Sequence, residues 1–291
     1  MNPTVTAPEP AGEALVDDGR PVVIITSEPD GKHYWRDLWA SRELLGMMVW
    51  RDVVVRYKQT AMGLSWALLR PLATMLVFTF IFGKLANLPS HGAPYALLVF
   101  AGLLPWLFFS AAFSDASNSV IGNANIVSKI YFPRLIIPVS AVLVGMVDFA
   151  LAMLVYLVMS FIYGHPPGWQ VVMLPLFLVH LCLFILACGL WVSALGVWYR
   201  DFRHLLPVLL QLGAYLSPVG FASSLVSERW YMLYALNPMV GLIDAFRWCL
   251  LGDGQPLRWA SVALSVLITF LLLLPGVRFF RRHEHNFADA L

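Results

Sequence analysis

MMVWRDVVVRYKQTAMGLSWALLRP, residues 47–71, decides the fold of this chain. Wound as a helix at 100° per residue, its first half has an apolar side and a polar side. The apolar side holds Met47, Trp50, Val53, Val54 and Tyr57, and the polar side holds Asp52, Arg56 and Gln59. Arg51 and Lys58 flank the apolar side, where their stems can lie on a greasy surface while their charges stay in water. We therefore expect an amphipathic helix on a membrane surface within residues 34–63, broken near Gly46, that leads into a first membrane span.

The composition excludes an ordinary water-soluble domain. Of the 291 residues, 59% are hydrophobic and 12% are charged, whereas soluble domains carry roughly 45–50% apolar and about 25% charged residues. The net charge of +2 is too small to indicate a nucleic-acid partner. The cysteines Cys182, Cys188 and Cys249 lack metal-ligand spacing, so we expect neither a disulfide framework nor a metal site. These features predict an all-α polytopic membrane protein.

Six runs are long and apolar enough to cross a bilayer, whose core of about 30 Å needs roughly 20 helical residues. They are residues 64–86, 95–114, 136–163, 171–198, 205–224 and 259–280. Residues 225–257 contain helix breakers such as Pro238 and Gly241, so we expect short re-entrant or interfacial helices there. Residues 1–33 are polar and rich in proline, without the apolar core of a signal peptide. The expected organisation is a flexible cytoplasmic tail over 1–33, an interface helix over 34–63, a six-span transmembrane domain over 64–280 and a second cytoplasmic tail over 281–291.

Lysine and arginine set the expected orientation. With the N-terminus inside, all but four of the 19 basic residues lie on inside segments; the exceptions are Lys84, Arg229, Arg247 and Arg258. Six spans then return the C-terminus to the same side, so we expect both termini in the cytoplasm. His283-Glu284-His285 falls in the C-terminal tail, and we expect it to be a solvent-exposed terminus.

The sequence lacks the common motifs of ATPases and hydrolases. None of its lysines sits in a G-x-x-x-x-G-K-[ST] phosphate loop, and there is neither a G-x-S-x-G elbow nor an H-E-x-x-H pair. We expect no catalytic residue and no cofactor in this chain. If the protein moves a substrate uphill, the energy must come from a separate subunit.

Two polar loops fall on the predicted inside. The first inside loop, residues 122–134, reads GNANIVSKIYFPR, and residues 123–131 predict a short surface helix that ends before Pro133. Its polar residues would face a soluble partner. The second inside loop, residues 198–204, reads WYRDFRH. From composition alone, an ordinary connecting loop and a charged anchor at a span end are the simpler interpretations.

Charged residues within the apolar runs are further candidates. Asp148 lies near the middle of the third run, where a carboxylate is costly and marks either a functional site or a structural hydrogen bond. Asp115 lies near the end of the second run, where a helix cap that includes Ser114 is the simpler interpretation. Asp244 and Arg247 are three residues apart, which suits a mutual pair.

Aromatic residues gather toward the outer half of the predicted spans. They include Trp106 and Phe109 of the second run and Tyr215 and Phe221 of the fifth. Aromatic rings stack on the C–H faces of sugars, so these residues are candidates for lining a glycan conduit. The interfacial aromatic belt that is common in membrane proteins explains any single ring better.

In order and spacing, these blocks resemble the permease subunits of ABC-2 type transporters that export polysaccharides, including O-antigen, capsule and teichoic acid. The matching residues are Arg51-Asp52, Arg56-Tyr57-Lys58-Gln59-Thr60, Gly63, Trp66 and Pro71; Asn125 with Lys129-Ile130-Tyr131-Phe132-Pro133-Arg134; Tyr199-Arg200-Asp201-Phe202-Arg203-His204 with Pro207; Ser217-Pro218; Asn237-Pro238; and Phe287-Ala288-Asp289. The resemblance covers residues 34–291. It implies a multi-pass homodimer in the bacterial inner (cytoplasmic) membrane, with two copies of a separate nucleotide-binding subunit that binds ATP and Mg.

The resemblance also implies roles for particular residues. ATPase coupling falls to the two inside loops, with Asn123, Asn125, Ile126, Val127, Lys129, Tyr131, Arg134, Arg200, Asp201, Arg203 and His204. We hypothesise that a basic collar receives the diphosphate of a polyprenyl-linked glycan from the membrane lipid, through Arg51, Arg56, Tyr57 and Lys58. The expected channel lining is Trp106, Phe109, Asp148, Tyr215 and Phe221.

Two other functional classes stay open. An ABC-2 type exporter of drugs or lipids would share this architecture but need a narrower, less aromatic route. A membrane-embedded transferase that acts on lipid-linked sugars would need acids and histidines that converge on one face, whereas Asp148 stands nearly alone.

Overall fold

The structure is a computed structural model that describes residues 34–58, 63–90, 92–130, 132–199, 201–254 and 257–287. The predicted tail over residues 1–33 lies outside these ranges, as do Tyr131 and Arg200 of the two inside loops. The described residues form helices and connecting turns without a β-strand, which confirms the all-α prediction.

Eleven α-helices make up the described part. They are α1 (Tyr34–Ala40), α2 (Arg42–Lys58), α3 (Gly63–Phe78), α4 (Tyr95–Gly122), α5 (Ala124–Val127), α6 (Ile136–Ile162), α7 (Leu174–Trp198), α8 (Phe202–Leu216), α9 (Glu228–Tyr234), α10 (Pro238–Leu251) and α11 (Trp259–His283). A π-helix, Thr79–Leu85, prolongs α3. Short 3-10 turns cover Trp169–Met173, Ser223–Leu225, Gly252–Gly254 and Glu284–Asn286.

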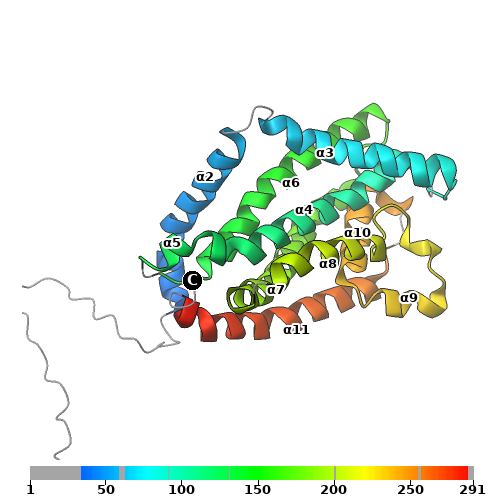
Figure 1. Cartoon of the computed structure of the whole chain (residues 1–291). Helices are drawn as coiled ribbons and strands as arrows, with labels where there is room; N and C mark the ends of the chain where they lie inside the picture. The colour runs from blue at the N-terminus through cyan, green and yellow to red at the C-terminus, as the bar shows by residue number, and fades with distance from the viewer. Residues whose placement is uncertain are drawn as a thin grey trace, which may run out of the picture.

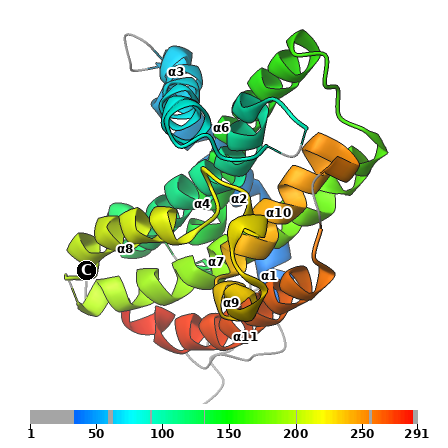
Figure 2. The same cartoon turned by 90° about the vertical axis from the view of Figure 1, so that its right-hand side faces the viewer.

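Five of the described helices are long and apolar enough to cross a membrane: α3 with its π-helical extension, α4, α6, α7 with the turn before it, and α11. They correspond to five of the six predicted runs. α4 lies at the centre of the bundle, packed against α6, α7, α10 and α3 (Figures 1 and 2). Most of its side chains are buried, so α4 is the scaffold around which the other helices are placed.

The predicted fifth run, residues 205–224, forms a shorter helix than expected. α8 ends at Leu216, and at about 1.5 Å per residue it rises only about 22 Å. The helix ends because Pro218 disfavours a helical conformation at Ser217, which is extended. The chain then passes close to the end of α3, where a Cβ on Gly220 would lie 2.6 Å from the Phe82 ring.

The predicted broken segment, residues 225–257, contains two short helices. α9 lies at the end of the bundle farthest from the C-terminus (Figure 1), and α10 is buried against α4, α7 and α11. Arg247 of α10 is 1% exposed and donates to three backbone carbonyls, those of Leu98, Val219 and Phe221. Asp244 accepts a hydrogen bond from Tyr231 at 3.4 Å. Both residues of the suggested pair therefore have other partners.

The break in the predicted interface helix lies at Ser41, between α1 and α2, and the predicted break at Gly46 is wrong. The hydroxyl and the amide of Ser41 both donate to the carbonyl of Asp37, at 2.8 and 2.9 Å, so helical hydrogen bonding continues up to the break. Gly46 lies within α2. Glycine costs a helix only about 1 kcal/mol relative to alanine, and the helix continues because its Leu44, Leu45 and Met48 pack in an apolar cluster with the bundle.

The predicted solvent-exposed C-terminal tail is also wrong at Glu284, which is 6% exposed. The Tyr34 side chain and the backbone of Arg134, just before α6, contact it. As a result α1, α2, α5 and the C-terminal end of α11 gather at one end of the bundle (Figure 1).

Candidate functional site

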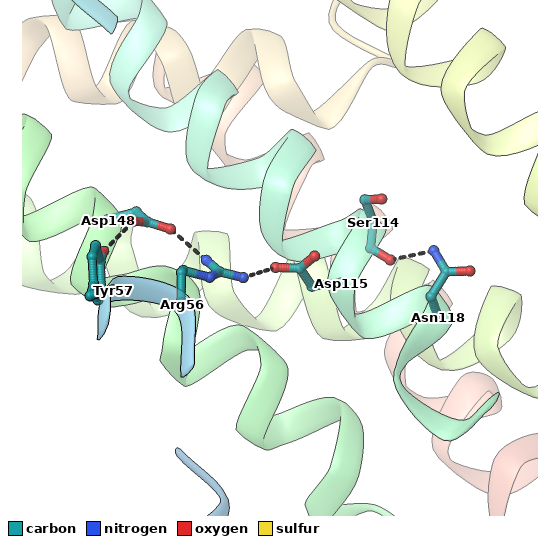
Figure 3. A network of polar contacts seen from close by, with 6 residues as sticks. All are labelled: Arg56, Tyr57, Ser114, Asp115, Asn118 and Asp148. Carbon is teal, nitrogen blue, oxygen red and sulfur yellow. Dashed lines mark hydrogen bonds and ion pairs between the residues drawn. The ribbon is translucent and has the colours of Figure 1, made fainter. Parts of the chain in front are cut away.

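Arg56 of α2 lies between two aspartates of the bundle (Figure 3). Nη1 of Arg56 is 2.5 Å from Oδ2 of Asp148, and its Nη2 is 2.5 Å from Oδ2 of Asp115. The Tyr57 hydroxyl donates to the other carboxylate oxygen of Asp148. We term these four residues the Arg56 cluster. Because Asp115 belongs to α4 and Asp148 to α6, the cluster ties α2 to two helices of the bundle.

Asp115 reaches Arg56 because α4 is longer than predicted. The second run was expected to end near Ser114, yet the helix continues to Gly122. The polar residues after Asp115 do not end the helix, because their side chains bond to carbonyls of the preceding turn. Asn118 donates to Ser114 at 2.9 Å (Figure 3) and Ser119 to Ala116 at 2.7 Å. The cap predicted at Ser114 and Asp115 is therefore wrong.

The Arg56 cluster is partly open to solvent and carries one excess negative charge. The side chains of Arg56, Asp115 and Asp148 are 33%, 39% and 33% exposed. Burial lowers the pKa of Arg56, but hydrogen bonds and charge from both aspartates outweigh this effect and raise it. Burial, followed by the hydrogen bond to Asp148, raises the pKa of Tyr57. Near neutral pH, Arg56 stays charged and Tyr57 stays protonated.

A cavity of about 670 Å³ opens beside the cluster, between α3, α4 and α8. Its polar lining comprises Arg56, Arg70, Thr74, Ser110, Ser114, Asp115, Asp148 and Gln211. Arg70 supplies a second cation, so the formal charges on the cavity wall balance. The apolar lining includes Trp106 and Phe78. Such a wall can hold a polar, ring-containing molecule within an otherwise apolar bundle.

Sequence reasoning missed several residues of this wall, including Arg70, Ser110 and Gln211. Each lies in a run of mostly apolar residues. A signal was available in their spacing, because Arg70 and Thr74 are four residues apart, as are Ser110 and Ser114. Residues four apart share a helix face, so each pair marks a polar stripe that faces the cavity.

The predicted channel-lining residues occupy different environments. Trp106 and Asp148 line the cavity. Phe109 is buried in the aromatic core, stacked on Phe113 and Phe184. Tyr215 is exposed on α8. Phe221 follows α8, and its carbonyl accepts a hydrogen bond from Arg247.

Two of the three cations in the predicted basic collar make ion pairs within the described residues, and the third does not. Arg56 is held by the two aspartates, whereas Arg51 pairs with neighbouring Asp52 at 2.7 Å and donates to Asn123 of the first inside loop at 3.0 Å. Lys58 is exposed at the end of α2 and makes no ion pair within the described ranges. The collar therefore does not form one continuous cationic surface.

The predicted apolar side of α2 turns partly away from the bundle. Met48 is buried, while Met47 and Trp50 are exposed. Trp35 and Trp39 of α1 are exposed as well. Exposed tryptophans beside cationic residues are typical of a helix that lies in a membrane interface.

The first inside loop contains the four-residue helix α5, shorter than the predicted helix over 123–131. Asn125 and Lys129 are exposed, Asn123, Ile126 and Arg134 are partly buried, and Val127 is buried. In the second inside loop Asp201 and His204 are exposed. The side chain of Arg203 lies outside the described residues, as do Arg200 and Tyr131.

The chemistry of the site suits holding and exchanging ions. Within the described ranges, no group of three or more His, Cys, Asp or Glu side chains is placed to hold a metal ion. The Arg56 cluster pairs charges across three helices, so an anion that competes for Arg56 would also loosen α2 from the bundle.

The chain is similar to known proteins along most of its length. A family model described as ABC-2 type transporter matches residues 43–251. The O-antigen export system permease protein RfbA of Myxococcus xanthus is 31% identical over 265 residues, which cover 88% of this chain and 98% of the relative. A protein of the same name from Klebsiella pneumoniae is 26% identical over 253 residues, 86% of this chain and 95% of its own. The polysialic acid transport protein KpsM of Escherichia coli is 21% identical over 239 residues, 80% of this chain and 91% of its own.

Proposed function

We propose, because this chain belongs to the ABC-2 type transporter family, that it is the permease subunit of an ATP-driven exporter of lipid-linked polysaccharide. The observation that carries the proposal is the end-to-end similarity to an O-antigen export permease. The apolar bundle and its polar-lined cavity support it, because a glycan needs a polar route between apolar helices. ATP and Mg would be bound by a separate nucleotide-binding subunit, so the chain itself needs no catalytic residue.

The proposed topology has six spans, with both ends on the cytoplasmic side of the bacterial inner membrane. Tyr34 and Glu284 are in contact, so α1 and the end of α11 share one side of the bundle. Chain ends on one side require an even number of crossings, and five long helices are too few by one. α8 with the segment after it supplies the sixth crossing in this proposal.

The segment after α8 has the features that a non-helical crossing needs. Backbone carbonyls at membrane depth must find partners inside the protein. Arg247 donates to the carbonyls of Val219 and Phe221, and Tyr95 donates to that of Gly220 at 2.7 Å. The remaining depth can thus be covered without a longer helix, and α9 and α10 are then the short helices at the outer mouth.

The proposed assembly contains two copies of this chain and two nucleotide-binding subunits. The exposed Asn125 and Lys129 of the first inside loop, with Asp201 and His204 of the second, would receive the motion of the ATPase. Exposed apolar side chains along α3 and the π-helix that prolongs it, including Leu69, Leu76 and Phe80, would face lipid or the second copy.

Substrate reception would begin at the exposed cations of α2 and end at the Arg56 cluster. Lys58 and Arg51 are accessible and would meet the diphosphate first. A diphosphate carries more charge than a carboxylate, so it would compete with Asp115 and Asp148 for Arg56. Loss of those ion pairs would free α2 and expose the cavity to the glycan.

The test is reconstitution with the ATPase encoded beside this chain, in proteoliposomes. We expect a polyprenyl-diphosphate-linked glycan to stimulate ATP hydrolysis several-fold and to reach the other side of the membrane. Stimulation by drugs or simple lipids alone would overturn the substrate class.

A matched pair of variants tests the coupling role. Lys129→Gln should reduce substrate-stimulated hydrolysis, while Lys84→Gln, which removes an exposed lysine from the far end of α3, should leave it unchanged. Equal stimulation in both variants would remove Lys129 from the coupling surface.

A further inference from the structure

The C-terminal end of the chain forms a second polar cluster, next to the first inside loop. The Tyr34 hydroxyl of α1 donates to Oε2 of Glu284 at 3.1 Å. The Arg281 guanidinium lies 4.1 Å from the centroid of the Tyr34 ring. We term Tyr34, Arg281 and Glu284 the Glu284 cluster. It joins the first and last described helices.

The Glu284 cluster holds the two residues that precede α6. The backbone of Arg134 donates to the Glu284 carboxylate, and the backbone of Leu135 donates to the Tyr34 oxygen. The first amides of α6 have backbone acceptors of their own, because Ile136 donates to Pro133 and Ile137 to Arg134, both at 3.1 Å. A carboxylate is favourable at this positive end of the helix. Glu284 thus holds the backbone of Arg134 just before α6, from the far end of the chain, at the point where the first inside loop ends.

An apolar contact anchors the same segment. Phe280 and Phe287 are fully buried, with ring centroids 5.2 Å apart. They share one apolar cluster with Val127 and Phe132 of the first inside loop and with Met48 of α2. Phe287 opens the motif Phe287-Ala288-Asp289, which the sequence singled out without a role. Its burial in the apolar cluster that it shares with the loop provides one.

We propose that residues 284–287 form a brace that holds the first inside loop in position to transmit motion from the ATPase, with Glu284 and Phe287 as positioning residues. This inference rests on the proposed coupling role of that loop. A four-residue helix such as α5 is not stable by itself, so the loop takes its rigidity from what packs on it. A loop held in place in this way transmits a movement of the ATPase to α6, and α6 carries Asp148 of the Arg56 cluster.

The brace itself can be tested on the full-length chain in lipid nanodiscs, whatever the substrate. Hydrogen–deuterium exchange should rise at least tenfold over residues 124–137 in Glu284→Ala and in Phe287→Ala. Glu284→Gln should keep slow exchange, because the amide oxygen accepts both hydrogen bonds. Phe270→Ala is the matched control, since it removes an exposed ring from the middle of α11. Unchanged exchange in Glu284→Ala would overturn the brace.

The coupling role is tested in the complex with the ATPase. Glu284→Ala should keep basal ATP hydrolysis and lose most of the stimulation by substrate, and Glu284→Gln should restore it. If Phe287→Ala does not fold, Phe287→Leu serves instead, with an intermediate loss expected. Faster exchange with full stimulation would overturn the coupling role. If no glycan stimulates even the unmodified complex, the proposed function fails, while the exchange experiment still decides the brace.

Discussion

The Arg56 cluster and the Glu284 cluster both fasten a surface element to the bundle, but they do so with opposite chemistry. The first pairs one guanidinium with two carboxylates whose side chains are about one third exposed. The second buries one carboxylate, 6% exposed, against a tyrosine hydroxyl and the backbone of Arg134. Ion pairs that face a cavity can exchange partners with an incoming anion. A buried, hydrogen-bonded carboxylate cannot exchange partners with an anion. It changes state by gaining or losing a proton instead.

The two clusters meet on the same helix. The Arg56 cluster uses Asp148, near the middle of α6, and the Glu284 cluster holds Arg134 just before the start of α6. α6 therefore lies between the place where a substrate would arrive and the place where the ATPase would push. The comparison predicts that the Arg56 cluster can be opened and the brace cannot.

The largest effect is expected from Arg56→Ala. The substitution leaves two carboxylates side by side without their cation, and we expect a loss of roughly 2–3 kcal/mol in the free energy of unfolding, reduced from the fully buried case by partial exposure. Denaturant titration of the purified chain in mixed lipid–detergent micelles measures it. Arg51→Ala is the control, with an effect within about 0.5 kcal/mol, because Arg51 is exposed. If both substitutions lowered the free energy of unfolding equally, the two arginines would not differ in how they stabilise the fold.

A change of pH should have an effect of intermediate size. Of the two clusters, only the Glu284 cluster should hold its segment with a strength that depends on pH. Burial raises the pKa of Glu284 to about 7, against the lowering effects of Tyr34, Arg134 and Arg281. A raised pKa means that the docked tail binds the proton more tightly than the free tail. Docking should therefore be strongest at low pH and weaken as the pH rises from 4.5 to 7, by at most about 2 kcal/mol between pH 5.5 and pH 7.

The measurement is amide exchange over residues 124–137 at pH 5.5 and pH 7.5, corrected for intrinsic rates. The loop should be better protected at pH 5.5, and Glu284→Gln should abolish the difference. A pH dependence that persists in Glu284→Gln would assign it to another group.

The smallest effect is expected from Tyr57→Phe. It removes one hydrogen bond to Asp148 and leaves the ion pairs intact, so we expect a loss of about 0.5–1.5 kcal/mol. A double-mutant cycle with Asp148→Asn isolates the pair. Zero coupling energy would mean that Tyr57 packs beside Asp148 without stabilising it.

Hydropathy predicted most of the bundle and failed where polar residues continue a helix. The first, third, fourth and sixth runs correspond closely to α3 with its extension, α6, α7 and α11. The second run was predicted to end at residue 114, because Asp115, Asn118 and Ser119 look like the start of a loop. In the fold the side chains of Asn118 and Ser119 bond back to the helix, so the helix continues and places Asp115 opposite Arg56.

The stretch from Met47 to Pro71 likewise shows which features follow from local sequence and which depend on the fold. Its sequence by itself determined a helix, cationic residues at the end of that helix and an apolar continuation, because these follow from local propensity and transfer free energy. Only the tertiary structure decided what the cationic residues do. Arg56 meets partners 59 and 92 residues away, and no local rule specifies which distant carboxylates a fold will bring to a guanidinium. The same reason explains Glu284, whose partner Tyr34 is 250 residues away.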